Sequence, residues 1–153
     1  MTKIVVVSDS HGDNQILKDV ASKHNDADVF LHLGDSETYE SEIYPFITIK
    51  GNNDYLINDE VKVLAIAGDR FYLTHGHRNY LDDNNMVRIA KKNECDFFLF
   101  GHTHRPYYKV IDNIYLINPG SLSYPRSSYG RTYGIIIIGD DKSIDYKLIE
   151  IDK

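Results

Sequence analysis

The chain has 153 residues, of which 42% are hydrophobic and 26% are charged, and its formal net charge is −6. This is the composition of an ordinary globular protein, and we predict one domain over residues 1–153. The negative charge argues against a long nucleic acid as partner, because nucleic-acid binders present a basic surface to the phosphates. A small phosphate ester is not excluded, since bound metal ions would set the charge of a local site.

Targeting and spanning segments are not visible in the sequence. No apolar run approaches the roughly 20 residues that cross a bilayer, so no membrane partner is expected. Residues 1–3 lead directly into an apolar strand pattern, without a signal-peptide pattern. The single cysteine, Cys95, cannot form an intrachain disulfide and is expected in the core. We therefore predict a cytoplasmic protein.

Strand and helix patterns alternate in the first third of the chain. The run Ile4–Val7 is short, apolar and β-branched, which predicts a strand buried on both faces. Asp13 is a candidate cap for a helix whose apolar residues recur at helical spacing over residues 16–21. Two more buried strands are predicted over Val29–Leu33 and Phe46–Lys50.

Hairpin patterns dominate the rest of the chain. A helix from about Asp83 to Glu94 and a buried strand over Asp96–Phe100 interrupt them. The predicted hairpins are Val61–Ala67 with Phe71–Thr74 around Gly68–Asp69, Tyr107–Ile111 with Ile114–Ile117 around Asp112–Asn113, and Ile135–Ile138 with Ser143–Ile149 around Gly139–Asp141. These elements predict an α/β fold with a mixed two-sheet core and helices outside.

Polar residues with metal-ligand chemistry follow five of the predicted strands. They are Asp9 and His11 after Ile4–Val7, Asp35 after Val29–Leu33, Asn52 and Asp54 after Phe46–Lys50, His75 at the end of Phe71–Thr74, and His102 and His104 after Asp96–Phe100. Ligands of α/β folds bind beyond the carboxyl ends of the strands. We therefore expect these side chains to meet at one edge of the sheets.

Each motif alone has an ordinary structural explanation. Asp9-x-His11 could cap a helix, residues 51–54 could form a turn, and a lone His75 is more often structural. His102 and His104 are a stronger signal, because two histidines one residue apart on a glycine-opened loop are uncommon without a metal. The combination of five such turns favours a metal site.

The ligand set contains oxygen and nitrogen donors but no thiolate. It disfavours copper(I) and structural zinc, and it suits manganese, iron, zinc, cobalt or nickel. Seven ligands are too many for one tetrahedral ion and suit two ions that share a carboxylate. We predict two divalent ions, with Mn²⁺ first and Ni²⁺, Fe²⁺, Zn²⁺ or Co²⁺ as alternatives.

The ordered motifs resemble those of the calcineurin-like metallophosphoesterase superfamily. The motifs are Asp9-x-His11, Gly34-Asp35, Gly51-Asn52-x-Asp54, His75-Gly76-His77 and Gly101-His102-x-His104. The short length, Ser8-Asp9-Ser10-His11-Gly12 and Asn118-Pro119-Gly120-Ser121 are similar to its small YfcE-type bacterial and archaeal phosphodiesterases. The resemblance implies a four-layer α/β/β/α sandwich with two mixed β-sheets flanked by helices. It implies one metal at Asp9, His11, Asp35 and His104, and another at Asp35, Asn52, His75 and His102.

The resemblance also implies a function. The expected protein is a dinuclear metal-dependent phosphoesterase, most specifically a phosphodiesterase that hydrolyses small phosphate diesters by attack of a metal-bridging hydroxide. The catalytic group would comprise Asp35, Asn52, His102 and His77. Two divalent ions carry four positive charges and two carboxylates return two, so an anionic phosphate can be held. The alternative is a catalytically weak, metal-binding interaction scaffold on the same fold. A retromer subunit that resembles these enzymes is regarded as such a scaffold. The filled ligand set favours the enzyme.

Several residues have open assignments. Many superfamily members have histidine where this chain has Asn53, whose amide is not a useful acid, so His77, His11 or a good leaving group must replace it. His24 is expected on the surface, and His32 is expected either in the core or supporting the ligands. Gly120–Ser121 either bends a loop toward the site or forms a plain turn. Arg126 and Arg131 are candidate phosphate contacts, although loop arginines are more often solvated. Some of the tyrosines could support a homodimer or homotetramer.

Overall fold

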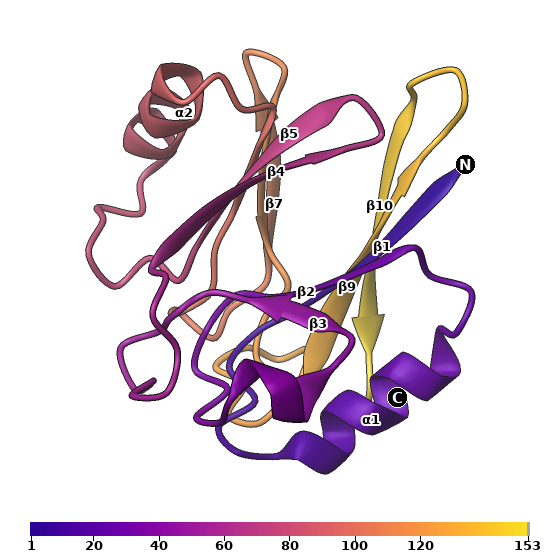
Figure 1. The fold of residues 1–153 in the computed structure, drawn as a ribbon. Coiled ribbons are helices and arrows are strands. Elements are labelled where there is room, and N and C mark those ends of the chain that lie inside the picture. Colours follow the sequence, from indigo (N-terminus) through magenta and orange to yellow (C-terminus); the bar gives the residue numbers. More distant parts are fainter. Residues whose placement is uncertain (153) are drawn as a thin grey trace.

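Two five-stranded sheets stack face to face in the computed structural model, which describes residues 1–152 (Figure 1). The elements in chain order are β1 (Thr2–Val7), α1 (Asn14–Lys23), β2 (Val29–His32), the 3₁₀ helix η1 (Glu40–Ile43), β3 (Phe46–Thr48), β4 (Val61–Ile66), β5 (Asp69–Thr74), α2 (Asp83–Lys92), β6 (Phe97–Leu99), β7 (Tyr107–Ile111), β8 (Ile114–Asn118), β9 (Thr132–Ile138) and β10 (Ile144–Glu150). All of the predicted strands and both predicted helices are present.

Both sheets are mixed. The first has the order β10-β9-β1-β2-β3, in which β1, β2 and β3 are parallel and β9 and β10 run antiparallel to their neighbours. The second has the order β4-β5-β6-β8-β7, in which β5, β6 and β8 are parallel and the edge strands β4 and β7 are antiparallel. With α1 outside one sheet and α2 outside the other, the predicted four-layer α/β/β/α sandwich is confirmed (Figure 1).

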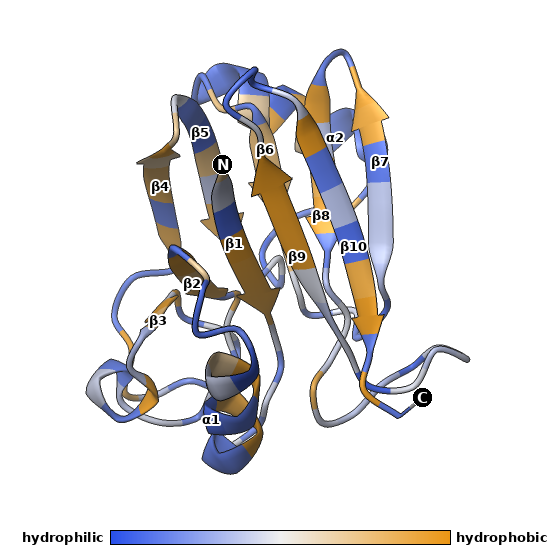
Figure 2. Cartoon of the chain, turned by 90° about the vertical axis from the view of Figure 1, so that its right-hand side faces the viewer, coloured by the Kyte–Doolittle hydropathy of each residue, from blue (hydrophilic) through white to orange (hydrophobic). Residues whose placement is uncertain are grey.

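The continuous apolar run of β1 is explained by burial on both faces. Ile4 and Val6 pack between the two sheets, whereas Val5 and Val7 pack beneath α1, and all four are fully buried. Successive side chains of a strand point to opposite faces, so a strand in the middle of this sandwich needs apolar residues at every position. The apolar colouring of β1 and β9 in Figure 2 shows the same pattern.

Each α-helix begins at an aspartate cap. The side chain of Asp13 accepts a hydrogen bond from the Ile16 amide at 3.1 Å, and Asp82 accepts one from the Asn85 amide at 2.8 Å. These bonds satisfy amides that have no partner inside the helix. Cys95 follows α2 in the core, 4% exposed, as predicted.

Two predictions about local structure are wrong. The turn between β4 and β5 is Ala67–Gly68 and not Gly68–Asp69, and both of its residues have positive φ, as tight hairpin turns require. His24 is buried and not on the surface, because it follows Leu17 and Val20 at helical spacing and so lies on the covered face of α1. Its Nε2 lies 2.6 Å from the Tyr133 hydroxyl.

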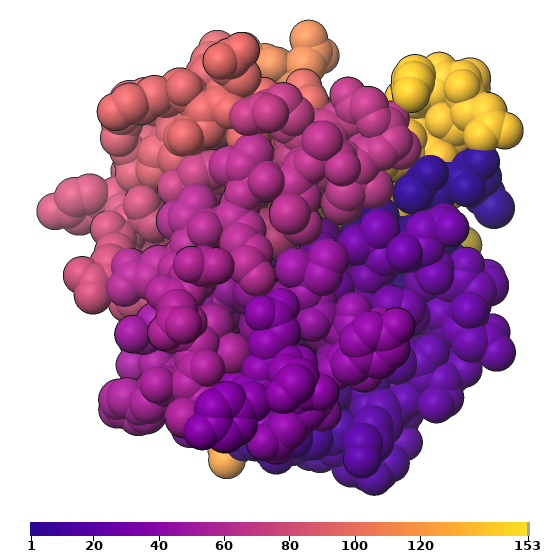
Figure 3. All heavy atoms as spheres, in the orientation of Figure 1, coloured from indigo at the N-terminus to yellow at the C-terminus, as the bar shows by residue number. Residues whose placement is uncertain are grey.

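The two ends of β1 lie in different surroundings. At its start, the amino group of Met1 pairs with Asp140 of the β9–β10 hairpin, where indigo and yellow atoms adjoin in Figure 3. At its end, the chain enters the loop of Asp9 and His11. Among the described residues, no helix combines the length and apolarity that a membrane span requires.

Candidate metal centre

The loops that follow the parallel strands are joined to one another by main-chain hydrogen bonds. The Asp9 amide donates to the Gly34 carbonyl at 3.0 Å, and the His11 amide donates to the Asp35 carbonyl at 2.9 Å. In the second sheet, the Gly101 amide donates to the His75 carbonyl at 3.0 Å. The carboxyl ends of β1, β2, β5 and β6 therefore deliver their loops to one edge, as the sequence predicts.

Strained backbone marks this edge. Positive φ angles occur at five of the predicted ligands: Asp9 (54°), His11 (47°), Asp35 (60°), His102 (68°) and His104 (60°). This region is uncommon for residues with a side chain, and it persists where surrounding structure enforces it, often at functional sites. With these backbone conformations, the carboxylates and imidazoles of the short loops converge.

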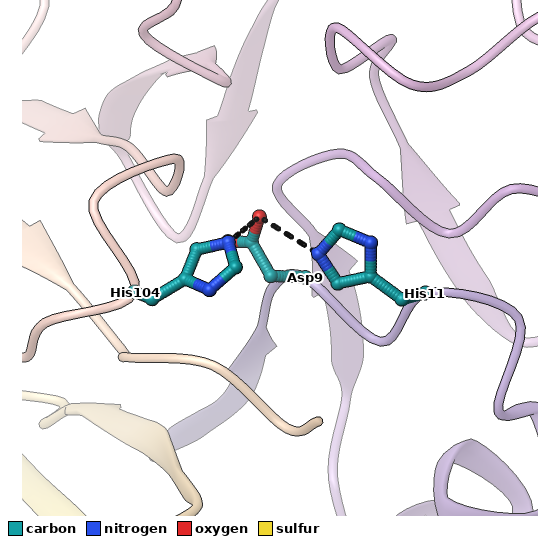
Figure 4. Close-up of side chains that lie close together, drawn as sticks. All are labelled: Asp9, His11 and His104. Atoms are coloured by element: carbon teal, nitrogen blue, oxygen red, sulfur yellow. Dashed lines mark ion pairs between the residues drawn. The ribbon is translucent and has the colours of Figure 1, made fainter. Parts of the chain in front are cut away.

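Asp9, His11 and His104 form the first group of converging ligand atoms (Figure 4). Oδ1 of Asp9 lies 3.2 Å from Nε2 of His104 and 3.8 Å from Nε2 of His11. The three atoms lie within 4.8 Å of one another, which is close enough for all of them to bind one metal ion.

Asp9, Asp35 and His75 form a second group beside the first. Nε2 of His75 lies 3.3 Å from Oδ2 of Asp35 and 3.7 Å from Oδ1 of Asp9. Oδ2 of Asp35 also lies 4.0 Å from Nε2 of His11. The carboxylates of Asp9 and Asp35 therefore both lie close to His75 and to His11.

The donor atoms of these groups suit a cation. Oδ1 of Asp9, Nε2 of His11 and Nε2 of His75 are buried and have no hydrogen-bond partner. Burying a polar atom without a partner is unfavourable, and a carboxylate oxygen facing two imidazole nitrogens is the donor set that divalent metals prefer. Asp9, His11, Asp35, His75 and His104 therefore fit a metal site, whereas His102, also a predicted ligand, lies outside both groups.

The other nitrogen of each ring is held by a hydrogen bond. Nδ1 of His75 donates to the Leu33 carbonyl at 2.8 Å, and Nδ1 of His104 donates to the Tyr124 carbonyl at 2.6 Å. Nδ1 of His11 lies 2.9 Å from a carboxylate oxygen of Glu37. Such bonds fix the tautomer and turn Nε2 toward the metal position. Sequence reasoning missed Glu37, whose only signal is its place two residues after Asp35.

A cavity of about 470 Å³ opens over the two groups. Asn52, Asn53 and His102 line it together with residues of both groups, and the His102 ring lies 5.2 Å from the His75 ring between centres. His77 lies beside His75, with 5.6 Å between ring centres, but it is not part of this lining. Of the two histidines considered for proton donation, His11 lines the cavity and His77 does not.

The predicted phosphate-binding arginines differ in position. Arg126 lines the cavity, and its amide donates to the His104 carbonyl at 3.0 Å. Arg131 instead forms an ion pair with Asp152 at 2.7 Å. Only Arg126 is placed to meet an anion in the cavity.

Buried polar residues hold the ligand loops in place by hydrogen bonds. The carboxylate of Asp54 accepts hydrogen bonds from the amides of Asp35 (2.8 Å), Gly51 (2.7 Å) and Glu37 (2.7 Å). The Ser121 hydroxyl donates to the Asp9 carbonyl at 2.9 Å. Gly120–Ser121 therefore belongs to a loop that supports the site, which is one of the two alternatives left open by the sequence.

His32 joins the first two loops. Its Nδ1 accepts a hydrogen bond from the Gly34 amide at 3.1 Å, and its Nε2 lies 2.8 Å from the Ser10 hydroxyl. Complete burial lowers the pKa of His32 to about 4, so the ring is neutral near pH 7. This placement combines both expectations, because the ring is in the core and also supports the loops of Asp9 and Asp35.

The charges of the ligands depend on their neighbours. Burial alone would raise the pKa of Asp35, but His75 and Asn53 bring it well below its usual range. Burial likewise raises the pKa of Asp9, and the close contact with His104 and the charge of His75 more than offset it. The carboxylates therefore stay ionised near neutral pH. Burial lowers the pKa of His102 and of His77, so both rings favour the neutral form.

Two glycines are required by the close approach of these loops. A Cβ atom at Gly51 would lie 2.2 Å from Oδ1 of Asp35, and one at Gly101 would lie 2.1 Å from the Ser8 hydroxyl. Neither distance is possible between real atoms, so any side chain here would displace a ligand loop.

The fold is that of the calcineurin-like phosphoesterases, and its Asp and His groups could hold a metal ion. The chain belongs to the calcineurin-like phosphoesterase superfamily, whose domain model matches residues 2–141. It is therefore a phosphoesterase of the hydrolase class, and members of this family are metal-dependent and act on small phosphate substrates.

Relatives of similar length support this assignment. A protein of Mycoplasma genitalium named probable metallophosphoesterase is 35% identical over 153 residues, covering 95% of this chain and 93% of the relative. A phosphodiesterase of Methanocaldococcus jannaschii is 26% identical over 176 residues, covering 98% and 99%.

Solved structures share the fold. A predicted phosphoesterase of Streptococcus pneumoniae has a TM-score of 0.86 at 30% identity, covering 99% of this chain and 90% of that one. The Vps29 protein of Entamoeba histolytica in complex with Zn²⁺ has a TM-score of 0.75 at 18% identity, covering 97% and 99%. The second likeness concerns the fold alone.

Proposed function

We propose that this protein is a phosphodiesterase that binds two divalent metal ions and hydrolyses small phosphate diesters. The observation that carries the proposal is the convergence of three buried, unpartnered donor atoms, from Asp9, His11 and His75, beside an open cavity that His11 lines. Relatives named phosphodiesterase favour diesters as the substrate class. A cytoplasmic location also remains a prediction.

The ligand assignment is the one that the resemblance to the superfamily implies, and it differs from the two groups of converging atoms, which share Asp9. One ion would take Asp9, His11, Asp35 and His104, and the other would take Asp35, Asn52, His75 and His102. Asp35 is proposed as the shared ligand, because its Oδ2 lies 3.3 Å from Nε2 of His75 and 4.0 Å from Nε2 of His11. Mn²⁺ is the first choice of metal, because the oxygen and nitrogen donors exclude a preference for soft ions.

Residues of the chain would bind and orient the ester. When bound, the metal ions would supply Lewis-acid charge for the phosphate and for activation of water. Arg126 lines the cavity and can pair with a phosphate oxygen. Asn52 contributes an uncharged oxygen, which preserves the positive charge of the site. His102 and His77 complete the proposed catalytic group with Asp35 and Asn52, and His11 remains a candidate proton donor.

The experiment uses protein stripped of metal and checked by elemental analysis. Hydrolysis of bis(4-nitrophenyl) phosphate should be lost after chelation and restored by Mn²⁺. Asp9→Asn should abolish the restored activity, whereas the matched surface variant Asp26→Asn should keep it, since Asp26 pairs only with Lys3 away from the site. Full activity in metal-free protein would reject the proposal. The interaction-scaffold alternative is not favoured, because every predicted ligand position is filled.

A further inference from the structure

A second cavity of about 300 Å³ lies beside the candidate metal centre. It is formed where α2 packs near the start of β7, and its apolar walls come from Leu81, Met86, Phe100, Pro106 and Tyr107. This size is at the lower end of the range for small-molecule pockets, which is roughly 300–1,000 Å³. It suits one aromatic ring or a short acyl chain.

The apolar cavity adjoins the loops that carry the ligands. Thr103 lines both cavities and lies between His102 and His104 in the chain. On another wall, Leu81 packs against Gly76, where an added Cβ would lie 3.1 Å from both Leu81 methyl carbons. Gly76 lies between His75 and His77. The two cavities are therefore neighbours that share Thr103 as a common wall, and the apolar cavity borders the His75–His77 segment at Leu81.

The hydroxyl and carboxylate groups of this lining already have partners, and Arg105, which is exposed, is the one cationic side chain among its described residues. The Thr103 hydroxyl accepts a hydrogen bond from Asn118 at 3.1 Å. The carboxylate of Asp83 accepts hydrogen bonds from the Tyr107 hydroxyl at 2.6 Å and from Lys109 at 2.8 Å. Over residues 1–152, none of the buried polar side-chain atoms that lack a partner belongs to this lining. A neutral ring or chain here gains chiefly from apolar burial, and the Arg105 guanidinium can add a cation–π contact with an aromatic ring.

The metal cavity has the opposite character, because its unpartnered donors and Arg126 suit the phosphate. We infer that the apolar cavity binds the organic group of the substrate, and that the substrates are phosphate esters of aromatic or bulky apolar alcohols. This inference rests on the proposed function, since the phosphate must lie at the metal centre for Thr103 to separate it from the organic group.

The first test measures binding of phosphonates by calorimetry to zinc-loaded protein. Methylphosphonate reports on the metal centre alone, and phenylphosphonate, benzylphosphonate and 3-phenylpropylphosphonate add a ring on linkers of increasing length. At the linker length that reaches past Thr103, the ring should tighten binding by roughly 10- to 100-fold relative to methylphosphonate. Leu81→Trp, which fills the cavity, should remove this gain and leave methylphosphonate affinity unchanged.

A second measurement locates the ring directly. The chain has two methionines, of which Met86 lines the cavity and Met1 is 77% exposed at the far end of β1. In protein labelled at the methionine methyl groups, the ring-bearing phosphonate should shift the Met86 NMR signal and leave the Met1 signal in place. Leu81→Ala, which enlarges the cavity without filling it, should retain this shift, and the unchanged methylphosphonate affinity of Leu81→Trp shows that its loss of the effect is not a folding defect.

The outcomes separate the two proposals. If methylphosphonate fails to bind in the presence of Zn²⁺ and also of Mn²⁺, the metal-centre proposal is wrong and the organic-group site is rejected with it. If methylphosphonate binds but no aryl phosphonate binds more tightly, the metal centre stands and the apolar site is rejected. A gain in affinity that survives Leu81→Trp and leaves the Met86 signal unmoved also rejects it, because the ring then lies elsewhere.

Discussion

Oδ2 of Asp54 lies 2.8 Å from the backbone nitrogen of Asp35 and accepts its hydrogen bond. The same carboxylate accepts the amides of Gly51 and Glu37, so one buried side chain holds both the Asp35 loop and the Asn52 loop. Asp54 is 1% exposed and binds no metal in the proposed assignment. Its effect on the site is through the position of Asp35.

Asp54→Asn should therefore weaken both folding and metal binding. The amide NH₂ of asparagine must face at least one backbone N–H, which leaves a buried donor without an acceptor and costs about 1–3 kcal/mol. Loss of a group that orients a ligand typically lowers metal affinity by about 10- to 100-fold. Urea unfolding of the metal-free protein and calorimetry with Mn²⁺ measure the two effects. Asp59→Asn, on the same segment but exposed, is the control, and equal behaviour of the two variants would contradict the role of Asp54.

The shared ligand is tested by metal stoichiometry. Asp35→Ala should impair both sites, because each ion loses a ligand and the two cations then face each other without the intervening charge. Asn52→Ala should chiefly weaken one site. Calorimetric titration with Mn²⁺ gives the number of ions bound, and two ions bound normally by Asp35→Ala would reject Asp35 as the bridge.

Arg126 and Arg131 form a matched pair for substrate binding. Arg126→Ala should raise KM for a diester by roughly tenfold, because it removes a charge-assisted hydrogen bond to the phosphate, and it should leave Mn²⁺ affinity nearly unchanged. Arg131→Ala should leave KM unchanged, since its guanidinium pairs with Asp152. Steady-state kinetics at saturating metal decides the matter. An unaltered KM in Arg126→Ala would show that its side chain does not meet the substrate.

The lowered pKa of His32 predicts that the protein loses stability in acid. The ring has a pKa of about 4 in the folded protein and about 6.5 when unfolded, so the unfolded chain binds a proton first as the pH falls. Its contribution is complete above pH 6.5 and is lost between about pH 6.5 and 4, with a total of up to about 3 kcal/mol.

His32→Asn is the variant that tests this. Its carbonyl oxygen can still accept the Gly34 amide, but it cannot titrate and it loses the bond to Ser10. We expect a lower free energy of unfolding at pH 7 and a flatter dependence on pH between 6.5 and 4, measured by urea unfolding of metal-free protein. Parallel curves for wild type and variant would rule out His32 as the source of the slope.

The sequence was sufficient to predict the layers and the edge that carries the site. Buried strands such as Ile4–Val7 must be apolar at every position, and the polar residue after each strand must then lie at the carboxyl edge. His24 also has a local signal for burial, because it follows Leu17 and Val20 at helical spacing on the covered face of α1.

Other features had no local signal. Ser121 contacts the main chain of Asp9, which is 112 residues away, and Tyr124 orients His104 across 20 residues. The bond between Glu37 and His11 spans 26 residues. Such contacts depend on how loops from different strands are folded together, and no periodicity or turn pattern within one segment encodes them.

Asn53 provides the last prediction. It lines the cavity, and its side-chain amide donates to Oδ2 of Asp35 at 3.0 Å. The position at which many superfamily members have histidine therefore holds a hydrogen-bond donor that cannot act as an acid. Without a proton donor, rates should fall steeply as the leaving alcohol becomes more basic. Asn53→His would place an imidazole, with an unperturbed pKa of about 6.5, beside the substrate.

A well-placed general acid contributes about 100- to 10,000-fold. We expect only about tenfold from Asn53→His, because the new ring lacks partners that orient it and the bond to Asp35 is lost. The gain should appear in kcat/KM for alkyl esters and be small for nitrophenyl esters, whose departure needs little protonation. Asn53→Ala at matched metal loading is the control, since it removes the amide without adding an acid. An equal change for both ester types would show that position 53 is not on the leaving-group side of the site.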